Sequence, residues 1–369
     1  MKRKILIASF LKPVNDIRSY EKIAQTLATN SSYTLYCTGY PSNIELSNNK
    51  VKLLPLSYFN KRGFGRIKAR WEAYKLYVKV KPELIIVNSP DLLLITCIYK
   101  ILFGSKIIYD IRENYFRNLW YQKNYFFGLR HLFALLTRSK EVFLSPLFSH
   151  FILAEKVYAA QLNFIGNRYM VIENKSLVPV KKRKKKKNSS SFQFLISGTI
   201  ATEYGVLEGI NFFTKIAKTT PTIRLKIIGY CANKQLFQKL IEIEKSNPKI
   251  TLKIATHPIP HIEIEQAIFA SDYGLLPYQE NQSIQGKWPT KIYEYMACQL
   301  PIIIQENETW NQFIQDHNVG VAINFANLNL PNVPIFLERE FYTNPLPNNI
   351  YWSSEEPTLL SVVENCLKE

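Results

Sequence analysis

Cysteine is scarce in this chain, which has only five cysteines among 369 residues. They are scattered, and no two of them form a C-x-x-C pair. An odd and dispersed set of thiols excludes a disulfide framework and a zinc site of the usual spacing. We therefore expect a protein of a reducing, cytoplasmic compartment. The five residues are Cys37, Cys97, Cys231, Cys298 and Cys366.

Long hydrophobic runs are also missing. No stretch of about 18 uncharged apolar residues occurs, so we expect no membrane-spanning helix. The basic and then apolar residues 1–11 superficially resemble a secretory leader. However, Lys12, Pro13 and Asp16 follow in place of a small-residue cleavage site. The apolar run is therefore predicted to form the first buried β-strand.

Acidic side chains are few: 29 Asp and Glu stand against 47 Lys and Arg, for a net charge of +18. Residues 1–180 carry a net charge of +16, residues 181–187 add +7, and residues 188–369 carry −5. A strongly basic first half indicates that this half faces an anionic surface, either nucleic acid or acidic lipid.

The middle of the chain has a run of seven Lys and Arg at 181–187, followed by Asn188 and three serines. This run has no apolar partner and is typical of a solvated linker, with attraction to lipid as a secondary effect. A nuclear-localisation or nucleic-acid patch is the alternative.

Strand and helix patterns alternate on both sides of this linker. Apolar runs such as Glu83–Asn88 and Tyr273–Leu276 predict buried strands, and the spacing of Val206–Lys218 predicts a helix. This alternation predicts an α/β protein of two Rossmann-like parallel-sheet domains facing each other across a cleft. The predicted parts are an N-terminal domain at 1–180, the linker at 181–191, a C-terminal domain at 192–350 and a last helix at 351–369.

The segment after Leu276 is the most informative one. A strand ends there, a polar loop follows, and Pro289 suits the first turn of a helix. Thr290, Lys291 and the backbone N–H groups of that turn make an anion site. Glu294 lies one turn later on the same face, where a carboxylate accepts hydrogen bonds from a ribose diol. A nucleoside diphosphate fits this pattern. The alternative is a capped surface helix whose glutamate only complements the helix dipole.

Residues 289–297, followed by 300–303, resemble the donor-binding signature of family-four (group 1) bacterial glycosyltransferases, which have the two-Rossmann GT-B fold. Further segments resemble the same family in chain order, so the likeness covers nearly the whole chain. It implies an enzyme that moves a sugar from a UDP- or GDP-linked donor, bound by the C-terminal half, to an acceptor bound by the N-terminal half. It also implies that the last helix packs back on the first domain. The further segments are residues 12–22, 109–114 and 196–206.

The resemblance implies roles for single residues. Glu294 would hold the ribose, Gly229 would let the backbone approach the base, and Tyr278 would line the donor cleft. The donor is a substrate, and neither a cofactor nor a metal is expected, since the chain has no Asp-x-Asp motif. The residues implied around the pyrophosphate are Gly198, Thr199, Thr290 and Lys291.

Three departures from the family pattern bear on mechanism. Gly286, with Lys287 beside it, stands where the family has a Glu that contacts the donor sugar. The loop after Gly198 lacks the family's cations. Lys287 and Lys291 are candidates to supply this charge, and Arg18 or Arg112 from across the cleft is the alternative. Arg112 stands in place of the family's His, and an arginine clamps phosphate but cannot act as a base near neutral pH. The family implies retention, but these changes leave the stereochemistry and the donor open.

An inverting reaction needs a carboxylate base, and Asp16 and Glu113 are the candidates because both follow predicted strands. With Arg112 they form the predicted catalytic group. Arg18 and Lys22 are predicted on the acceptor or phosphate side. A retaining reaction needs no protein base if the leaving phosphate takes the acceptor proton. The alternative role of both carboxylates is capping, or ion pairing with the two arginines.

Two segments of the first half, 61–80 and 115–138, combine aromatic, apolar and basic residues. Such segments dock on anionic membranes, which favours a lipid-linked or growing surface glycan as acceptor at the inner face of the membrane. A core helix with a snorkelling cationic edge is the alternative. Two other functions stay open: a sugar-nucleotide epimerase with the same donor site, and a non-enzymatic protein that binds nucleic acid or an anionic surface.

Overall fold

The chain forms two compact units in a computed structural model. Unit 1 comprises Met1–Asn174, Gln282–Lys287 and Trp352–Glu369, and unit 2 comprises Lys175–Asn281 and Trp288–Tyr351. The predicted linker at 181–191 lies, except for Ser191, outside the described residues. The structure describes residues 2–42, 50–60, 63–121, 127–179, 191–220, 222–279, 282, 285–327, 337 and 339–368.

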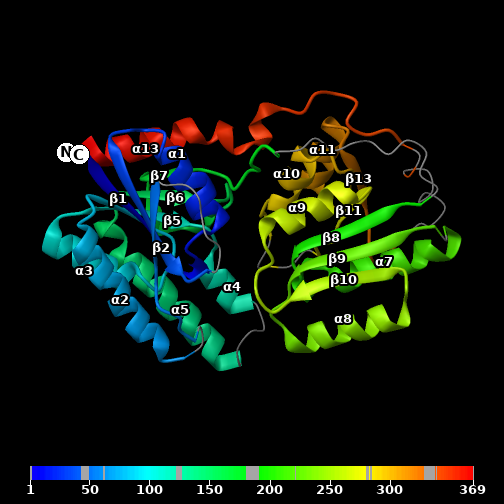
Figure 1. The fold of residues 1–369 in the computed structure, drawn as a ribbon, viewed down its shortest axis with the longest axis horizontal. Helices are drawn as coiled ribbons and strands as arrows, with labels where there is room; N and C mark the ends of the chain where they lie inside the picture. The colour runs from blue at the N-terminus through cyan, green and yellow to red at the C-terminus, as the bar shows by residue number, and fades with distance from the viewer. Residues whose placement is uncertain are drawn as a thin grey trace. The chain divides into compact units, whose positions relative to one another are not determined.

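Unit 1 is built on a seven-stranded parallel sheet of order β3-β2-β1-β4-β5-β6-β7. The helices α2, α3 and α5 cover one face, and α1 and α13 lie on the other (Figure 1). The strands are β1 (Arg3–Pro13), β2 (Tyr33–Tyr40), β3 (Val51–Pro55), β4 (Leu84–Val87), β5 (Lys106–Ile111), β6 (His150–Leu153) and β7 (Tyr169–Val171). The helices are the π-helix η1 (Ile17–Ala24), α1 (Gln25–Leu27), α2 (Gly65–Val80), α3 (Leu93–Phe103), α4 (Tyr115–Tyr121), α5 (Phe127–Leu144), α6 (Tyr158–Gln161) and α13 (Glu356–Lys368), with short 3-10 turns at Ser145–Leu147, Asn163–Ile165 and Trp352–Ser354.

Unit 2 repeats this arrangement with a six-stranded parallel sheet of order β10-β9-β8-β11-β12-β13. Helices α7 and α8 pack on one face, and α9, α10 and α11 pack on the other (Figure 1). The strands are β8 (Gln193–Thr199), β9 (Arg224–Tyr230), β10 (Ile250–Ala255), β11 (Tyr273–Leu276), β12 (Ile302–Gln305) and β13 (Gly320–Ile323). The helices are α7 (Val206–Thr219), α8 (Lys234–Ser246), α9 (His261–Ala270), α10 (Thr290–Ala297) and α11 (Glu308–Asp316), with 3-10 turns at Thr202–Tyr204 and Asn348–Ile350.

The leader-like run at the start of the chain is the central strand β1. Its residues from Ile5 to Phe10 are buried, and it pairs with both β2 and β4. A strand covered by helices on both faces needs apolar side chains on both sides, which explains the unbroken hydrophobic run. The interpretation of this run as a buried strand is confirmed.

The strand order reverses beside the first strand of each unit. In unit 1, β1 lies between β2 and β4, and in unit 2, β8 lies between β9 and β11. Connections leave such a pair in opposite directions, so a crevice opens at the carboxyl ends of the two strands. The loops after β1 and β8 are therefore the places where each unit can hold a ligand.

The segment that ends the chain is part of unit 1. Trp352 is fully buried, and its indole Nε1 donates to Thr26 Oγ1 at 2.9 Å. Helix α13 buries Leu359, Val362 and Val363, and Arg3 donates to the backbone oxygen of Leu367. Unit 1 is thus assembled from residues of both ends of the sequence.

All five cysteines are buried and lie outside disulfide bonds. Within the described ranges, none of the helices combines the length and the apolar character needed to cross a membrane.

Candidate functional site

The carboxyl end of β8 in unit 2 is shaped by two glycines. A Cβ atom on Gly229 would lie 1.8 Å from the backbone oxygen of Gly198, so only glycine lets the ends of β8 and β9 approach this closely. Gly198 itself has a φ of +105°, and a Cβ atom there would lie 2.7 Å from Lys291 Cε. The strand end is therefore packed directly under the lysine side chain. Thr199 follows as the last, exposed residue of β8.

Helix α10 brings the other predicted donor residues to this strand end. Pro289 is its N-cap, and Thr290 is its first helical residue. Lys291 Nζ forms an ion pair with the Glu294 carboxylate one turn later, and both side chains are partly buried. A cation, a carboxylate and a helix N-terminus thus lie together beside Gly198, which suits an anion next to a hydrogen-bonding sugar.

Tyr278 lies just after β11, in a cluster of aromatic rings. Its ring meets Tyr204 edge-on at 5.5 Å between centroids and Trp310 at 6.4 Å. Burial raises the pKa of Tyr278 well above its usual value, so the phenol stays neutral. Gly205, with a φ of +73°, lies against Pro277, where a Cβ atom would be 1.7 Å from the proline backbone oxygen. The loop after β8 is therefore fixed beside the end of β11.

Unit 1 has a network of four charged side chains at the carboxyl ends of β1 and β5. Asp110 is completely buried and accepts from Arg18 Nη2 at 2.8 Å and from Arg112 Nε at 2.8 Å. Arg112 also donates through Nη1 to Asp16 at 2.5 Å and through Nη2 to Ser19 Oγ at 2.7 Å. Two arginines and two aspartates balance in charge, so the network holds the strand ends together without a net charge.

The network also fixes the protonation of its members. Burial disfavours the charged forms of Asp16 and Asp110, but the neighbouring guanidinium groups hold the pKa of each carboxyl below its ordinary value. Burial likewise opposes the charge of Arg112, but Asp16 and Asp110 raise its pKa. Both carboxylates therefore stay ionised, and a carboxylate with a lowered pKa is a weak base.

The predicted phosphate-side cations are buried inside unit 1. Arg18 is 4% exposed and also donates to the Ile172 backbone oxygen at 2.9 Å. Lys22 is 5% exposed and donates to Asn174 Oδ1 at 2.7 Å. Both cations lie near the face of the Trp352 ring, at 6.0 and 5.9 Å from its centroid. Ile172 and Asn174 are both residues of unit 1.

Glu113 and Lys287 form a second charged cluster in unit 1, to which the Gln282–Lys287 segment belongs. Lys287 Nζ lies 2.8 Å from Glu113 Oε2, which also accepts from Asn118 Nδ2 at 3.0 Å. The Glu113 side chain is 45% exposed; its partial burial opposes ionisation, but Lys287 holds the pKa of this carboxyl below its ordinary value. The structure thus places Lys287 with the predicted catalytic carboxylate and groups it in a different unit from Lys291.

Gly286 has a physical reason to be a glycine. Its φ is +74°, and a Cβ atom there would lie 2.8 Å from Val157 Cγ2. A glutamate at this position, which the resembling family has, would require both a strained backbone and a displaced neighbour.

Several polar residues of unit 1 were missed by sequence reasoning. Ser9 and Ser19 share a hydrogen bond of 2.9 Å, and Asn88 Nδ2 donates to Ser9 Oγ at 2.6 Å. Asn88 in turn accepts from Tyr115 through its backbone oxygen at 2.9 Å. The available signal was the position of Ser9 and Asn88 at the ends of apolar runs, where polar side chains gather at the sheet edge.

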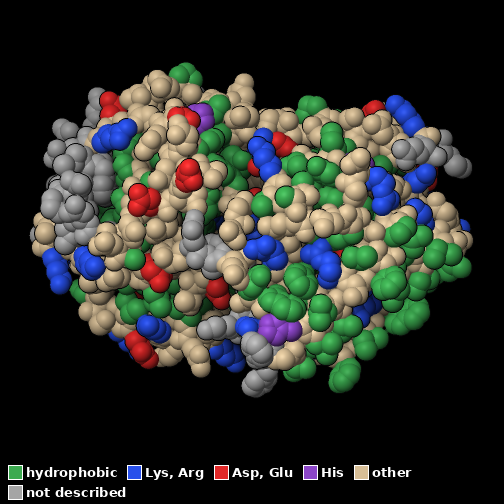
Figure 2. Space-filling model, turned by 180° about the vertical axis from the view of Figure 1, so that it is seen from behind, with side chains coloured by type: hydrophobic (Ala, Val, Ile, Leu, Met, Phe, Trp, Pro, Cys, Tyr) green, Lys and Arg blue, Asp and Glu red, His purple; other side chains and the backbone are tan. Residues whose placement is uncertain are grey.

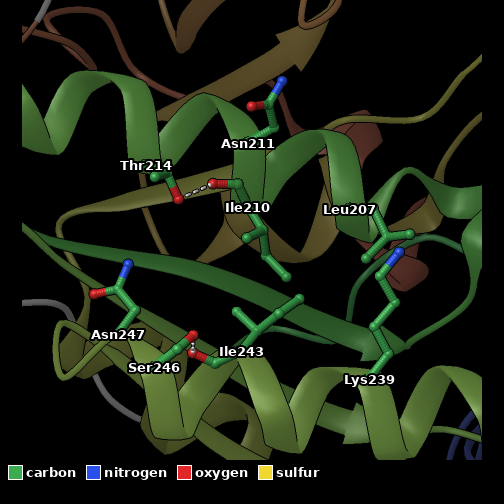
Figure 3. Close-up of a pocket in the computed structure, with 8 residues that line it drawn as sticks. All are labelled: Leu207, Ile210, Asn211, Thr214, Lys239, Ile243, Ser246 and Asn247. Atoms are coloured by element: carbon green, nitrogen blue, oxygen red, sulfur yellow. Dashed lines mark hydrogen bonds between the residues drawn. The ribbon is translucent and has the colours of Figure 1, made fainter.

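A groove lies between α7 and α8 (Figure 3). Thr214 and Ser246 in its wall donate to backbone oxygens of their own helices. None of the predicted site residues lines this groove, so it is separate from the strand-end site. Its lining residues are Leu207, Ile210, Asn211, Thr214, Lys239, Ile243, Ser246 and Asn247.

Among the residues that the structure describes, no group of three or more His, Cys, Asp or Glu side chains is placed to hold a metal ion.

Residues 178–328 match the sequence model of the family described as glycosyl transferases group 1. This match covers the part of the chain that holds Gly198, Lys291 and Glu294. The resemblance to this family, predicted from the sequence, is thereby confirmed. A search of curated proteins gives no significant match.

Solved structures with the same fold align with nearly the whole chain. Sucrose-phosphate synthase from Thermosynechococcus elongatus has a TM-score of 0.71 at 12% identity, covering 99% of each chain. HepE from Anabaena, solved with UDP and glucose, has a TM-score of 0.60 at 10% identity, covering 98% of each chain. WaaG, a glycosyltransferase of lipopolysaccharide biosynthesis, has a TM-score of 0.61 at 12% identity, covering 99% of this chain and 90% of its own. The predicted GT-B fold of two parallel-sheet domains is confirmed.

Proposed function

We propose that this chain is a glycosyltransferase that moves a sugar from a UDP- or GDP-linked donor to a cell-surface glycan or lipid-linked acceptor. One observation carries the proposal: Lys291 and Glu294, at the start of α10, lie beside Gly198 within the segment that matches the group 1 family. The complex of HepE with UDP supports a uridine donor for proteins of this fold.

Each residue of the unit 2 site has a proposed task. Glu294 accepts hydrogen bonds from the ribose hydroxyls, and Lys291, released from Glu294, neutralises the diphosphate. The backbone at Gly198 and Thr199, together with the first turn of α10, contacts the phosphate oxygens. Tyr278 lines the donor site, and Gly229 leaves room beside the base. No metal is needed for this arrangement, because a lysine and a helix N-terminus stabilise the leaving group.

The chemistry favoured by unit 1 is transfer without a protein base. Asp16 and Glu113 each have a lowered pKa, and Arg112 cannot accept a proton. The leaving diphosphate therefore takes the proton of the acceptor hydroxyl. The bond from the anomeric carbon to the diphosphate oxygen breaks, and the bond to the acceptor oxygen forms. This course is compatible with retention, and Arg112 and its carboxylate partners serve to position the acceptor.

The proposed acceptor is a surface glycan or a lipid-linked glycan, with the enzyme in the cytoplasm at the inner face of the membrane. The role of WaaG in lipopolysaccharide biosynthesis supports this acceptor class for the fold. The basic character of residues 1–180 supports an anionic membrane surface as a partner rather than nucleic acid, because no nucleic-acid-binding motif accompanies it.

The first test is thermal unfolding of the protein with UDP, GDP, ADP or CMP, with and without Mg²⁺. A nucleotide present at about a hundred times its dissociation constant stabilises the protein by about 2.7 kcal/mol. We expect one diphosphate to stabilise the chain without Mg²⁺, and its monophosphate to do so much less. A lack of stabilisation by every one of these nucleotides would refute the donor site.

Lys291→Ala is expected to lower turnover about 100-fold, because one of the groups that stabilise the leaving diphosphate is lost. Release of UDP from UDP-sugars by slow hydrolysis measures this effect without a known acceptor. Lys245→Ala, which removes an exposed lysine of α8 in the same unit, is the matched control and should leave the rate unchanged. Equal rates in the two variants would remove Lys291 from the mechanism.

A further inference from the structure

Helix α3 is apolar on two opposite faces. Its inner face buries Leu93, Ile95 and Cys97 against the sheet of unit 1. Its outer face exposes Ile98 by 40% and Ile101 by 69%. A surface helix normally carries polar side chains on its solvent side, so this outer face lacks the character of a water-facing surface. The other exposed apolar residues of α3 are Leu94, Leu102 and Phe103.

The helices on either side of α3 extend this exposed apolar surface. Helices α2 and α5 each contact α3 in the same layer over the sheet (Figure 1). Figure 2, seen from behind, shows hydrophobic side chains gathered on the part of the molecule that holds this layer. The exposed apolar residues are Phe64, Ile67, Trp71 and Val78 in or next to α2, and Leu129, Leu132, Phe133, Leu135, Leu136, Val142 and Phe143 in α5.

The same three helices are strongly basic. They contain nine Lys and Arg but only two acidic residues. Glu141 is buried, and Glu72 accepts from the backbone and hydroxyl of Ser57. On α2, the exposed Lys68 and Lys75 lie within about one turn of the exposed Trp71. Cations and apolar side chains are therefore interleaved on one surface.

The combination of cations and exposed apolar side chains on one surface indicates which kind of partner binds there. A nucleic acid would pair with the cations but leave the isoleucines and leucines in water, and an apolar protein surface would leave the cations unpaired. An anionic bilayer accommodates both, because the acyl region takes the apolar groups and the headgroups take the lysines. Trp71 has the amphipathic ring that favours the headgroup level.

We propose that the outer face of α3, flanked by α2 and α5, docks on a bilayer that contains anionic phospholipids. The proposal deepens the proposed function, whose lipid-linked acceptor requires the enzyme at a membrane, by assigning the element that meets the lipid. Two arginines of the predicted 115–138 segment, Arg117 and Arg138, contribute less because they are engaged within unit 1. Arg117 donates to the Gln282 backbone oxygen at 2.6 Å, and Arg138 donates to Asn114 at 2.8 Å.

The test measures binding of the full chain to vesicles of phosphatidylcholine with one quarter phosphatidylglycerol, by co-sedimentation without nucleotide. The double variant Ile101→Gln, Leu102→Gln is expected to bind at least tenfold more weakly than the natural sequence. Both side chains are exposed, so the change removes no core contact. Ile262→Gln alters an exposed isoleucine of α9 in unit 2 and is the control, for which no loss is expected.

A second set of variants tests whether the lysines contribute to vesicle binding. Lys75→Glu with Lys79→Glu should weaken binding to the anionic vesicles, whereas Lys218→Glu on α7 of unit 2 should change it little. Undiminished binding by the Ile101, Leu102 variant overturns the proposal, as does dimerisation through the same residues without vesicle binding, or binding to single-stranded DNA alone. UDP binding measured without vesicles reports on the donor site separately, so failure of one proposal is distinguishable from failure of the other.

Discussion

Glu294→Ala is expected to weaken binding of the stabilising diphosphate about 10- to 100-fold. A hydrogen bond to a charged group contributes about 1.5 to 3 kcal/mol, and the carboxylate is proposed to accept from the ribose. Lys291 of α10, which forms an ion pair with Glu294, stays beside Gly198 at the end of β8 in the variant and can still bind the phosphates. Isothermal titration calorimetry of the variant against UDP and GDP measures the loss.

A deoxyribonucleotide separates ribose contact from a general disturbance of the site. If Glu294 binds the 2′-hydroxyl, the substitution costs less affinity for 2′-deoxy-UDP than for UDP, because the partner group is already missing. Glu242→Ala, at an exposed position of α8, is the control for an unspecific effect of losing a carboxylate. An equal loss for both nucleotides would contradict the assignment of Glu294 to the ribose.

Asp110→Asn is expected to lower the free energy of unfolding by about 3 to 5 kcal/mol, the usual cost of breaking a buried ion pair. Asp110 is wholly buried between Arg18 and Arg112. The substitution leaves two buried guanidinium groups with Asp16 as their only carboxylate in the network. Urea unfolding followed by tryptophan fluorescence measures the change.

Unit 1 contains its own matched control for this prediction. Asp91 accepts from Arg66 and from Arg70 at 2.6 Å each, but this cluster is partly exposed. Asp91→Asn therefore makes the same chemical change beside two arginines in contact with water, where an ion pair contributes about 0 to 1 kcal/mol. A loss at Asp91 as large as that at Asp110 would show that burial is not the cause.

The central strands of both sheets could be predicted from the sequence, because parallel strands that are buried on both faces form continuous apolar runs. Leu84–Val87 falls inside the predicted strand, and Tyr273–Leu276 has the predicted bounds. The edge strands β3, β7 and β13 and the short interior strand β6 were not predicted. Val51–Pro55 and Tyr169–Val171 are mostly only partly buried, so their side chains do not form the unbroken apolar run that marked the others.

The unit 2 site was predictable because its residues are local. Thr290, Lys291 and Glu294 share a helix face by spacing alone, and the structure brings them to Gly198. The roles of Arg18 and Lys22 depend on partners 92 and 152 positions away, Asp110 and Asn174. Such pairs are set by the order of strands in the sheet, which local pattern does not encode.

The apolar outer face of α3 also has a signal in the sequence, although no prediction was based on it. Between Leu93 and Phe103 only Thr96 and Lys100 are strongly polar, so a helix there is apolar nearly all round. A one-sided helix over a sheet needs only half of these apolar positions. The excess leaves a second apolar face, which the structure exposes on the outer side of α3.

The place of Trp352 in unit 1 determines the order in which the protein is completed during synthesis. Residues 1–174 emerge from the ribosome first, but the pocket formed by Thr26, Arg18 and Lys22 waits for an indole made almost two hundred residues later. The six strands described for unit 2 end at Ile323, so its sheet can pair before the last helix of unit 1 is made. The first 174 residues of unit 1 therefore wait for their last core residues until unit 2, which ends at Tyr351, has also been made, and they are the part of the nascent chain that depends longest on protection from aggregation.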